Sequence, residues 1–417
     1  MKKILTLTAL GTILLASNAM AAGFHLREQS AAAQGNAFAG ATAGAENNSY
    51  AYFNAAGLTR HKGDQFTAGA TYIVPRAEAS NVKDSSGNRG QDVNNIVHSA
   101  WAPNGTYSHQ VDDKLTVGAS LNVPFGMITK YDSQWPGSDH GITSKLESVA
   151  LTPMAAYKVT DKLSVGAGLP IQYISARLSN GVSMGGTSLG ETTIKGDTAD
   201  VGYQLSALYE LSEDTRFGIN YRSEINHKFK GDISGSGRAS MIPYLNQDIS
   251  VKLDAPAMLS LGAYHQINEK WAVMAEWQRV FWSSFKSLDV IGSERVGGNG
   301  SYMLSSTPEN WRDTDFFALG ASYQIDNQWK LRLGMAYDQT AVKKKDRTIR
   351  IPDSDRLWYS AGLGYQYNEN LSFDMAYTYI QAKKASVDTA SDATHRGVYA
   401  EYNNSIKLWG ISATYRF

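Results

Sequence analysis

The fold is decided by a short stretch of sequence, Ile325-Asp326-Asn327-Gln328-Trp329-Lys330-Leu331-Arg332-Leu333-Gly334-Met335. Its first four residues are a strand end and a polar turn, and apolar side chains then recur at every second position from Trp329 to Met335. A period of two places successive side chains on opposite faces of a β-strand. The stretch therefore predicts two antiparallel strands joined by a tight turn.

The same pattern of turn and alternating strand occurs six times, and long polar segments separate one copy from the next. In a soluble sandwich the apolar face of each strand would lie in a core, and periodicity alone does not exclude that arrangement. Tight turns on one side and long loops on the other instead indicate a bacterial outer-membrane β-barrel. The six turns lie at 111–114, 159–162, 211–214, 267–270, 325–328 and 367–370.

The number of strands follows from the number of turns, because each turn joins two strands. One further strand is expected at about Phe66–Arg76, and a last one at about Tyr402–Phe417. We therefore predict an all-β fold, a 14-stranded antiparallel transmembrane β-barrel whose chain starts and ends on the periplasmic side. Its longest extracellular loops are expected near 126–146, 229–254 and 284–314.

The two ends of the chain favour the membrane alternative. Met1–Ala21 combines two lysines, a short apolar run and Ala19-Met20-Ala21, which is typical of a cleaved signal peptide; the run is too short for an uncleaved anchor helix. The last strand alternates apolar residues and ends in Phe417, which resembles the signal that directs outer-membrane proteins to insertion. We expect a bacterial outer-membrane location and the barrel-assembly machinery as a partner.

Composition excludes several classes of function. The formal net charge is zero, so no basic surface for nucleic acid is expected. The chain has no cysteine, and its eight histidines are scattered without metal-ligand spacing or a neighbouring serine or acid. We therefore predict no catalytic residues, no metal and no cofactor.

The segment before the first strand is predicted to be a plug (hatch). Fourteen strands enclose a lumen too wide for barrel side chains to fill. Residues 22–64 are rich in Ala, Gly, Ser and Asn and show no sustained alternation, so they suit close packing inside the lumen. A disordered periplasmic tail is the alternative. The predicted organisation is a signal peptide at 1–21, a plug at 22–64 and a barrel at 65–417.

Four motifs resemble the family of outer-membrane long-chain fatty acid transporters, which also includes importers of aromatic hydrocarbons. The resemblance covers nearly the whole mature chain and is most specific in its last motif. The motifs are Ala22-Gly23-Phe24-His25-Leu26; Gly35–Gly40 with Asn54-Ala55-Ala56-Gly57-Leu58; Pro124-Phe125-Gly126 with Tyr131 and Trp135; and Tyr337-Asp338 with Arg347–Trp358.

The resemblance implies a fourteen-stranded barrel with a plug, and a route for hydrophobic ligands from an outer groove through an internal pocket to a gap beside a kinked third strand. It places Phe24 in the pocket and a basic residue for the ligand head group at Arg312, with Arg177 as a further candidate. From its strand parity, Arg177 faces the lumen only if a bulge intervenes.

The resemblance also assigns the plug motif, the kink and a group of charges. The family usually has proline where this chain has Ala55 in its plug motif. The kink is expected at Pro124, which cannot donate to a ladder, or at Gly118; the alternative is that Pro124 only ends the strand at the loop. The remaining assignments are the plug motif Asn54, Ala55 and Ala56, and a structural charge network of Asp338, Asp353, Asp355 and Arg356.

The leading hypothesis is passive uptake of long-chain fatty acids or similar hydrophobic compounds, with lateral release into the bilayer. The alternatives are a water-filled general porin, an importer of aromatic hydrocarbons, and a surface adhesin or phage receptor built on the long loops. Lys343-Lys344-Lys345 is a candidate contact for the anionic lipopolysaccharide of the outer leaflet. A monomer is expected.

Overall fold

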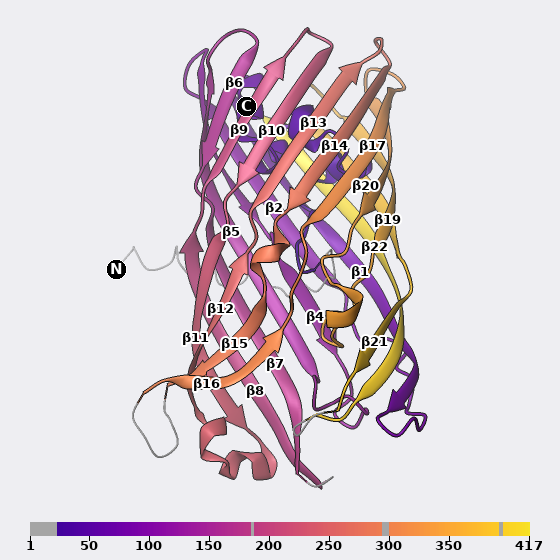
Figure 1. Ribbon diagram of the computed structural model, residues 1–417. Coiled ribbons are helices and arrows are strands. Elements are labelled where there is room, and N and C mark those ends of the chain that lie inside the picture. The colour runs from indigo at the N-terminus through magenta and orange to yellow at the C-terminus, as the bar shows by residue number, and fades with distance from the viewer. Residues whose placement is uncertain (1–22, 185–186, 294–299, 392–394) are drawn as a thin grey trace, which may run out of the picture.

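The computed structural model describes residues 23–417 except 185–186, 294–299 and 392–394, so the predicted signal peptide lies outside the described residues. The chain forms one closed sheet of antiparallel strands, in which the first strand, β1 (Asp64–Asp84), pairs with the last, β22 (Val398–Arg416) (Figure 1). This pairing runs from Gln65↔Arg416 to Asp84↔Val398 and closes the barrel. None of the helices in the described residues is long and apolar enough to cross a membrane.

The described part of the sheet contains 22 strand segments, which make the predicted fourteen strands because eight strands are interrupted. The interrupted strands are β3/β4, β6/β7, β8/β9, β10/β11, β12/β13, β14/β15, β16/β17 and β20/β21. In chain order the segments between β1 and β22 are β2 (Ala100–Gln110), β3 (Leu115–Asn122), β4 (Gly126–Lys130), β5 (Thr143–Lys158), β6 (Leu163–Gly168), β7 (Ile171–Met184), β8 (Thr187–Val201), β9 (Gln204–Glu210), β10 (Thr215–Arg222), β11 (Ile225–Gly235), β12 (Gln247–Ala255), β13 (Met258–Gln266), β14 (Trp271–Val280), β15 (Ser287–Gly292), β16 (Tyr302–Pro308), β17 (Thr314–Gln324), β18 (Trp329–Asp338), β19 (Arg356–Gln366), β20 (Leu371–Ala382) and β21 (Ala385–Thr389).

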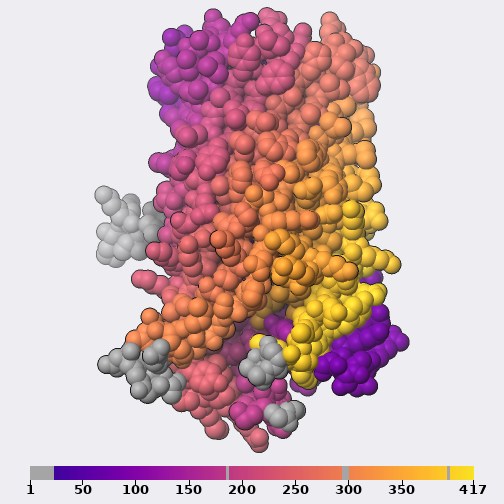
Figure 2. All heavy atoms as spheres, in the orientation of Figure 1, coloured from indigo at the N-terminus to yellow at the C-terminus, as the bar shows by residue number. Residues whose placement is uncertain are grey.

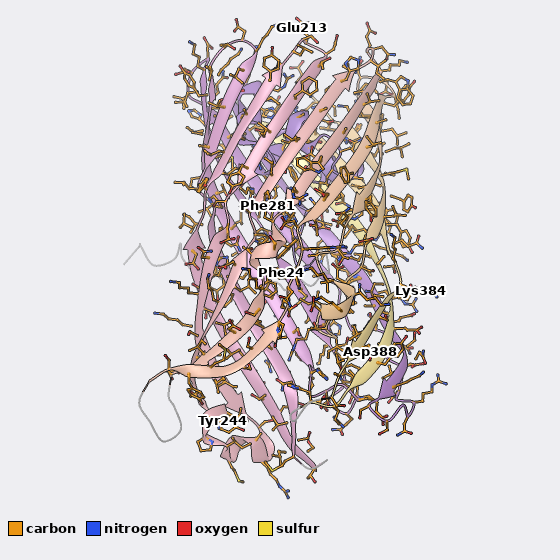
Figure 3. The ribbon with its side chains drawn as sticks, in the orientation of Figure 1. Phe24, Glu213, Tyr244, Phe281, Lys384 and Asp388 are labelled. Carbon is orange, nitrogen blue, oxygen red and sulfur yellow. The ribbon has the colours of Figure 1, made fainter. Side chains whose placement is uncertain are left out.

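The tight turns lie together at the upper end of the barrel in Figures 1 and 3, where Glu213 is labelled. In the turn before β18, Asp326 Oδ1 accepts hydrogen bonds from the backbone N–H groups of Gln328 and Trp329, both at 2.8 Å. Asn, Asp, Ser and Thr favour turns for this reason. Asp112, Asn268 and Asn368 make the same pair of bonds in their turns.

Large apolar side chains cover the outside of the barrel in the half nearest these turns. Phe66, Tyr107, Phe217, Leu333 and Ile411 are all exposed there. Such a band faces lipid in an outer-membrane barrel. Towards the other end the strands run further than predicted: β11 extends to Gly235 and β12 begins at Gln247, so the expected loop at 229–254 is mostly strand. The expected loops at 126–146 and 284–314 likewise contain β4, β15 and β16, because strands outside the membrane carry polar residues on both faces and lose their alternation.

Residues 23–63 lie inside the barrel and form four short helices, α1 (Ala31–Gly35), α2 (Ala41–Gly44), η1 (Asn48–Tyr52) and η2 (Ala55–Arg60) (Figure 1). Their side chains are almost all buried, and the helices pack against β5, β6, β13, β19 and β20, on different sides of the lumen. We call these residues the plug. The extracellular side carries the remaining helices, η3 (Gly237–Met241), η4 (Pro243–Leu245), η5 (Trp282–Ser284) and η6 (Lys344–Asp346).

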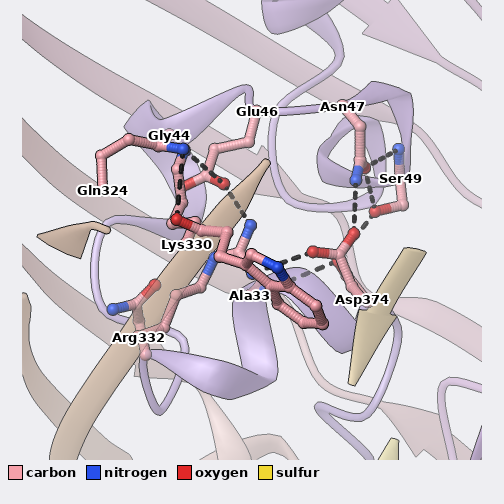
Figure 4. A network of polar contacts seen from close by, with 12 residues as sticks. Ala33, Gly44, Glu46, Asn47, Ser49, Gln324, Lys330, Arg332 and Asp374 are labelled. Carbon is pink, nitrogen blue, oxygen red and sulfur yellow. Dashed lines mark hydrogen bonds and ion pairs between the residues drawn. The ribbon is translucent and has the colours of Figure 1, made fainter. Parts of the chain in front are cut away.

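Charged groups join the plug to the inner wall (Figure 4). Arg332 on β18 donates to Glu46 of the plug at 2.7 Å and pairs with Asp374 on β20 at 2.8 Å. Asn47 of the plug also donates to Asp374, at 3.4 Å. Buried charges are tolerated when they are paired and hydrogen-bonded in this way.

Glycines on the inner wall let the plug backbone approach the strands. A Cβ atom at Gly218 on β10 would lie only 1.9 Å from the carbonyl oxygen of Thr42 in the plug. A Cβ atom at Gly105 on β2 has its nearest neighbour at 3.8 Å.

We predict that Gly218→Ala displaces the plug, whereas Gly105→Ala leaves it in place. Overpacking of this kind costs about 1–3 kcal/mol. The displaced plug should produce ion conductance in planar bilayers and a lower unfolding temperature. Equal conductance of the two variants would contradict the close packing of plug and wall.

Candidate ligand-binding site

An aromatic cluster lies where the plug begins. The ring of Phe24, which is buried, is 4.7 Å from that of Trp282, 5.6 Å from Trp311, 5.8 Å from Phe125 and 6.2 Å from Phe285, measured between centroids. Trp282, Phe285 and Trp311 reach inward because two neighbouring strands are interrupted there, between β14 and β15 and between β16 and β17. The cluster thus joins the plug to two distant parts of the wall.

An apolar cavity of about 80 Å³ adjoins Phe24 on its extracellular side. Its walls come from the inner faces of β5, β7, β8, β11 and β12, with side chains such as Leu146, Phe229, Val251 and Leu253. Figure 3 labels Phe24 near mid-height of the barrel, and Figure 2 shows the outer end hollowed between the orange and yellow loops. The cavity is therefore an apolar chamber on the extracellular side of the plug, which is the lower side in Figures 1 and 3.

Apart from Lys145 and Lys195 on the strands of the wall, two charged residues line this chamber, Arg350 and Glu309 from extracellular segments. Arg350 donates to the hydroxyl of Ser144 at 2.9 Å and to the carbonyl oxygens of Thr143 and Ser179 at 3.1 and 3.3 Å, and burial lowers its pKa to about 10. Burial raises the pKa of Glu309 to about 7, against the opposing effects of the indole N–H of Trp311, which donates to it at 2.8 Å, and of Arg350. Among the described residues, no ion pair joins Arg350 to a carboxylate. The chamber therefore presents one guanidinium without a carboxylate partner.

The predicted head-group cations lie elsewhere. Arg312 is exposed, donates to the carbonyl of Thr340 at 3.1 Å and is 3.9 Å from a carboxylate oxygen of Asp355. Arg177 is exposed on the outward face of β7, because the two-residue interruption at Leu169-Pro170 preserves the parity of the strand. Neither side chain borders the chamber, and sequence reasoning missed Arg350, although it lies in the most specific of the four motifs.

The predicted charge network is assembled by the loop between β18 and β19. Arg356 pairs with Asp353 and lies 3.6 Å from Asp338. Asp353 also accepts hydrogen bonds from Gly23 N of the plug, at 3.2 Å, and from the hydroxyl of Thr340. Asp355 forms its own contacts with Lys383 at 3.1 Å and the Tyr337 hydroxyl at 2.9 Å. These charges hold the loop and the first plug residue together.

The wall is broken beside the chamber, at the third strand. β2 pairs with β3 only from Gly105↔Leu121 onward, so the edge of Ala100–Asn104 has no strand partner on that side among the described residues. The break ends where Lys130 N donates to the Ile96 carbonyl at 2.7 Å. We call this gap the wall opening.

The opening arises from residues 123–125, which turn into the lumen. Between the pairs Asn122↔Ala150 and Gly126↔Glu147, the third strand has three residues where β5 has two, which is a β-bulge. Pro124, at its centre, has no N–H to pair. Gly118 lies in regular pairing with Ser108 and Met154, so the strand is not kinked there.

The start of the plug supplies the hydrogen-bond partners that the wall lacks. Leu26 N donates to the Pro124 carbonyl at 2.8 Å, and Gly126 N donates to the Phe24 carbonyl at 2.9 Å. The side-chain amide of Gln29 donates to the Val123 carbonyl at 2.7 Å and accepts from Val123 N at 3.2 Å. The displaced segment is therefore paired with the plug rather than with β2.

The predicted plug motif forms the start of η2. Asn54 caps this helix by accepting from Ala56 N at 2.9 Å, and its amide donates to the carbonyls of Thr42 and Ala207. Ala55 occupies the first helical position, where proline is also favoured, so either residue suits the start of this helix. Ala55 and Ala56 pack directly on Gly166 of the wall.

These features define a class, an outer-membrane β-barrel whose lumen is occluded by its own N-terminal segment. The family model described as outer membrane protein transport protein (OMPP1/FadL/TodX) matches residues 12–417, and the chain belongs to this family of transport proteins of the bacterial outer membrane. Among its relatives is the long-chain fatty acid transport protein of Escherichia coli O6:H1, 29% identical over 98% of this chain and 97% of the relative. The outer membrane protein P1 of Haemophilus influenzae is 29% identical over 99% of each chain.

Solved structures show the same fold. A Pseudomonas aeruginosa FadL homologue superposes with a TM-score of 0.86 and 26% identity, covering 95% of this chain and 100% of that one. The Pseudomonas putida toluene transporter TodX superposes with a TM-score of 0.70 and 19% identity, covering 94% of this chain and 99% of that one.

We predict that Glu309 makes stability depend on pH. Its pKa in the fold, about 7, is above the ordinary value of 4.5, so the folded protein binds the proton more tightly. Stability should be greatest below about pH 4.5 and fall as pH rises to about 7, by at most about 3 kcal/mol. Urea unfolding in lipid vesicles, followed by tryptophan fluorescence, measures this slope.

Glu309→Gln should remove that part of the slope, whereas Glu213→Gln, in an exposed turn, should keep it. An unchanged slope in Glu309→Gln would show that the carboxyl is not protonated in the folded state at neutral pH.

Proposed function

We propose that the protein takes up long-chain fatty acids or similar hydrophobic compounds passively and releases them sideways into the outer membrane. The proposal is supported above all by the apolar chamber, whose floor residue Phe24 is hydrogen-bonded to the segment that leaves the wall open. The chamber proposed for the hydrophobic ligand is thereby adjacent to the wall opening, the proposed route into lipid. The fatty acid relatives and the hydrocarbon transporters of the same fold are consistent with this class of ligand.

The chamber favours an acyl chain with an anionic head. Each buried CH₂ group contributes about 0.8 kcal/mol in an apolar environment. Arg350 replaces Arg312 and Arg177 as the proposed head-group cation, because it borders the chamber and they do not. The protonated form of Glu309 would leave the positive charge of Arg350 available to a carboxylate.

Capture is proposed to occur on extracellular apolar side chains. Met184, Met241, Tyr244 and Met303 are exposed at the outer ends of β7, η3, η4 and β16, and Figure 3 labels Tyr244 at the loop end. Beneath them lies a small buried cluster of apolar residues, Ile233, Ala239, Leu245, Ile249 and Val290. Exposed apolar patches of this kind mark binding surfaces.

Exit through the wall is favoured over exit into the periplasm. On the periplasmic side of the plug lies a cavity of about 650 Å³ lined largely by polar and charged side chains, among them Glu46, Arg60, Arg332 and Arg416. An acyl chain would lose its apolar contacts in such a vestibule. The wall opening instead leads to lipid.

A general porin is the weaker alternative, because the plug fills the lumen at the level of its four helices. Removal of residues 22–64 would turn the occluded barrel into a conducting one. Import of aromatic hydrocarbons differs from the proposal only in the head group, and an adhesin or phage receptor role of the loops is compatible with transport. Enzymatic activity is not proposed, because the family consists of transport proteins.

Arg177 is reassigned to a lipid contact. It is in register with Lys145 on β5 and Lys195 on β8, and all three share the parity of lipid-facing residues such as Ile171. Neighbouring strands are about 4.8 Å apart, so the three cations form a row on the outer surface, in which Lys145 also pairs with Glu147 at 2.9 Å. We include lipopolysaccharide phosphates as their partner, with the Lys343–Lys345 run, insertion by the barrel-assembly machinery and a monomeric state as further parts of the proposal.

Oleate binding and growth test the proposed function. The protein should bind oleate and restore growth on oleate to a strain that lacks such a transporter. Phe24→Ala should weaken binding about 10- to 100-fold, as expected for losing about 1.5–3 kcal/mol of aromatic contact. Phe66→Ala, on the lipid-facing surface, is the matched control. If the unaltered protein neither binds oleate nor supports growth, the fatty acid proposal is wrong.

Deletion of Pro124 tests the lateral exit. Removing one residue restores equal numbers of residues between the flanking pairs with β5, so the third strand can pair with Ala100–Asn104. Uptake should fall at least about tenfold while oleate affinity changes less than about threefold. Full uptake by a correctly folded deletion variant would exclude the wall opening as the exit.

A further inference from the structure

A second, smaller cavity lies next to the first residues of the plug. Its volume is about 20 Å³, and it is bounded by the plug and by the inner faces of β10, β13, β14 and β17. Phe24 borders the apolar chamber, and the next residue, His25, borders this second cavity. The two cavities are thus separated by the first residues of the plug.

Three buried polar atoms at this cavity have no hydrogen-bond partner: Nε2 of His25, the hydroxyl of Tyr52 and Nε of Arg222. The side chains of His25 and Tyr52 are only 3% and 4% exposed. A buried polar atom without a partner is costly, and three at one cavity indicate a missing ligand or water.

One charged group at the cavity, Arg222, has no carboxylate partner among the described residues. Arg222 stacks on the ring of Tyr52, with its guanidinium carbon 3.8 Å from the centroid, and donates to the Tyr52 carbonyl and the Gln204 side chain. Among the described residues no carboxylate pairs with Arg222. The ion pairs of arginines in the lumen belong to Arg27, Arg332 and Arg356. A guanidinium in this position lacks its counter-charge.

The two other charged groups at the cavity are already engaged. Arg27 contacts Gln278 and lies 3.7 Å from Asp338. Glu276 uses one carboxylate oxygen for the backbone N–H of Thr42, at 3.0 Å, and the other for the Thr42 hydroxyl. Arg27 thus has a carboxylate partner in Asp338 and Glu276 is bonded to Thr42, whereas Arg222 has no carboxylate partner among the described residues.

We propose that this cavity is an anion subsite that binds one carboxylate through Arg222, Tyr52 and His25. Its volume admits one or two water-sized groups, which matches the two oxygens of a carboxylate. A water molecule would satisfy the unpaired atoms but leave the positive charge uncompensated. The carboxylate is that of a fatty acid that has passed Phe24, so this identity of the ligand rests on the proposed function.

The first experiment uses bromide and does not depend on transport. Crystals of the full-length mature protein soaked in sodium bromide should show an anomalous peak within hydrogen-bond distance of Arg222 and Tyr52. The peak should be lost in Arg222→Gln and kept in Arg89→Gln, which removes an exposed loop arginine. Water density without an anomalous signal in the unaltered protein would overturn the anion subsite.

The second experiment distinguishes a carboxylate from an uncharged ligand. Tyr52→Phe removes a hydroxyl that has no partner in the fold, so it should not lower the unfolding temperature. It should weaken oleate binding about three- to tenfold and leave methyl oleate binding unchanged, whereas Tyr107→Phe, on the outer surface, should affect neither. Equal affinities of Tyr52→Phe and the unaltered protein for oleate would refute the carboxylate assignment.

The outcomes separate the two proposals. If the unaltered protein binds neither oleate nor methyl oleate but the bromide peak is present, the proposed function fails and the anion subsite stands. If oleate binds and neither Arg222→Gln nor Tyr52→Phe changes its preference over methyl oleate, the subsite fails and the proposed function stands.

Discussion

Backbone hydrogen bonding is the constraint on which this structure depends. Within a bilayer no water is present to pair with exposed N–H and C=O groups, so a sheet must close on itself. The pairing of β1 with β22 achieves this closure along nearly the full length of both strands. The third strand breaks this rule locally. It can do so because the plug pairs with the backbone groups of residues 123–126, which β2 does not reach. The plug is thus part of the hydrogen-bonded wall as well as an occlusion of the lumen.

The same segment must also fill a lumen whose wall is largely polar, and its apolar side chains, such as Phe38 and Phe53, pack in one cluster with wall residues such as Phe316 and Trp358. Inward-facing positions of an outer-membrane barrel are polar, and the plug meets them with small residues and paired charges. Gly166, Gly218 and Gly334 admit the plug backbone, while Arg332 is held between Glu46 and Asp374. The lumen differs in character on the two sides of this polar layer, since the extracellular chamber near Phe24 is apolar and the periplasmic vestibule is charged. That difference gives an apolar molecule a preferred side of the plug.

Sequence predicts the repeated parts of this molecule well and its interruptions poorly. The turn at Asp326 and the alternation from Trp329 to Met335 are local properties, so they lead directly to the number of strands. Pro124 was recognisable for the same reason, because proline affects its own pairing. Arg350 was missed because it lies in an irregular loop and reaches Ser144, more than two hundred positions away, only once the barrel has closed. The outward orientation of Arg177 follows from strand parity alone, and its side chain does not border the chamber.

The size of the chamber argues for coupling between ligand entry and the wall opening. A cavity of about 80 Å³ is smaller than the roughly 150 Å³ that holds one benzene molecule, so an acyl chain must move one of its walls. Most of those walls are strands fixed on both sides, whereas Phe24 belongs to a segment held by a few hydrogen bonds. Its carbonyl accepts from Gly126, and Leu26 donates to Pro124. Displacement of Phe24 would therefore remove hydrogen-bond partners from the residues that border the opening, and we expect binding in the chamber to be coupled to rearrangement of the third strand.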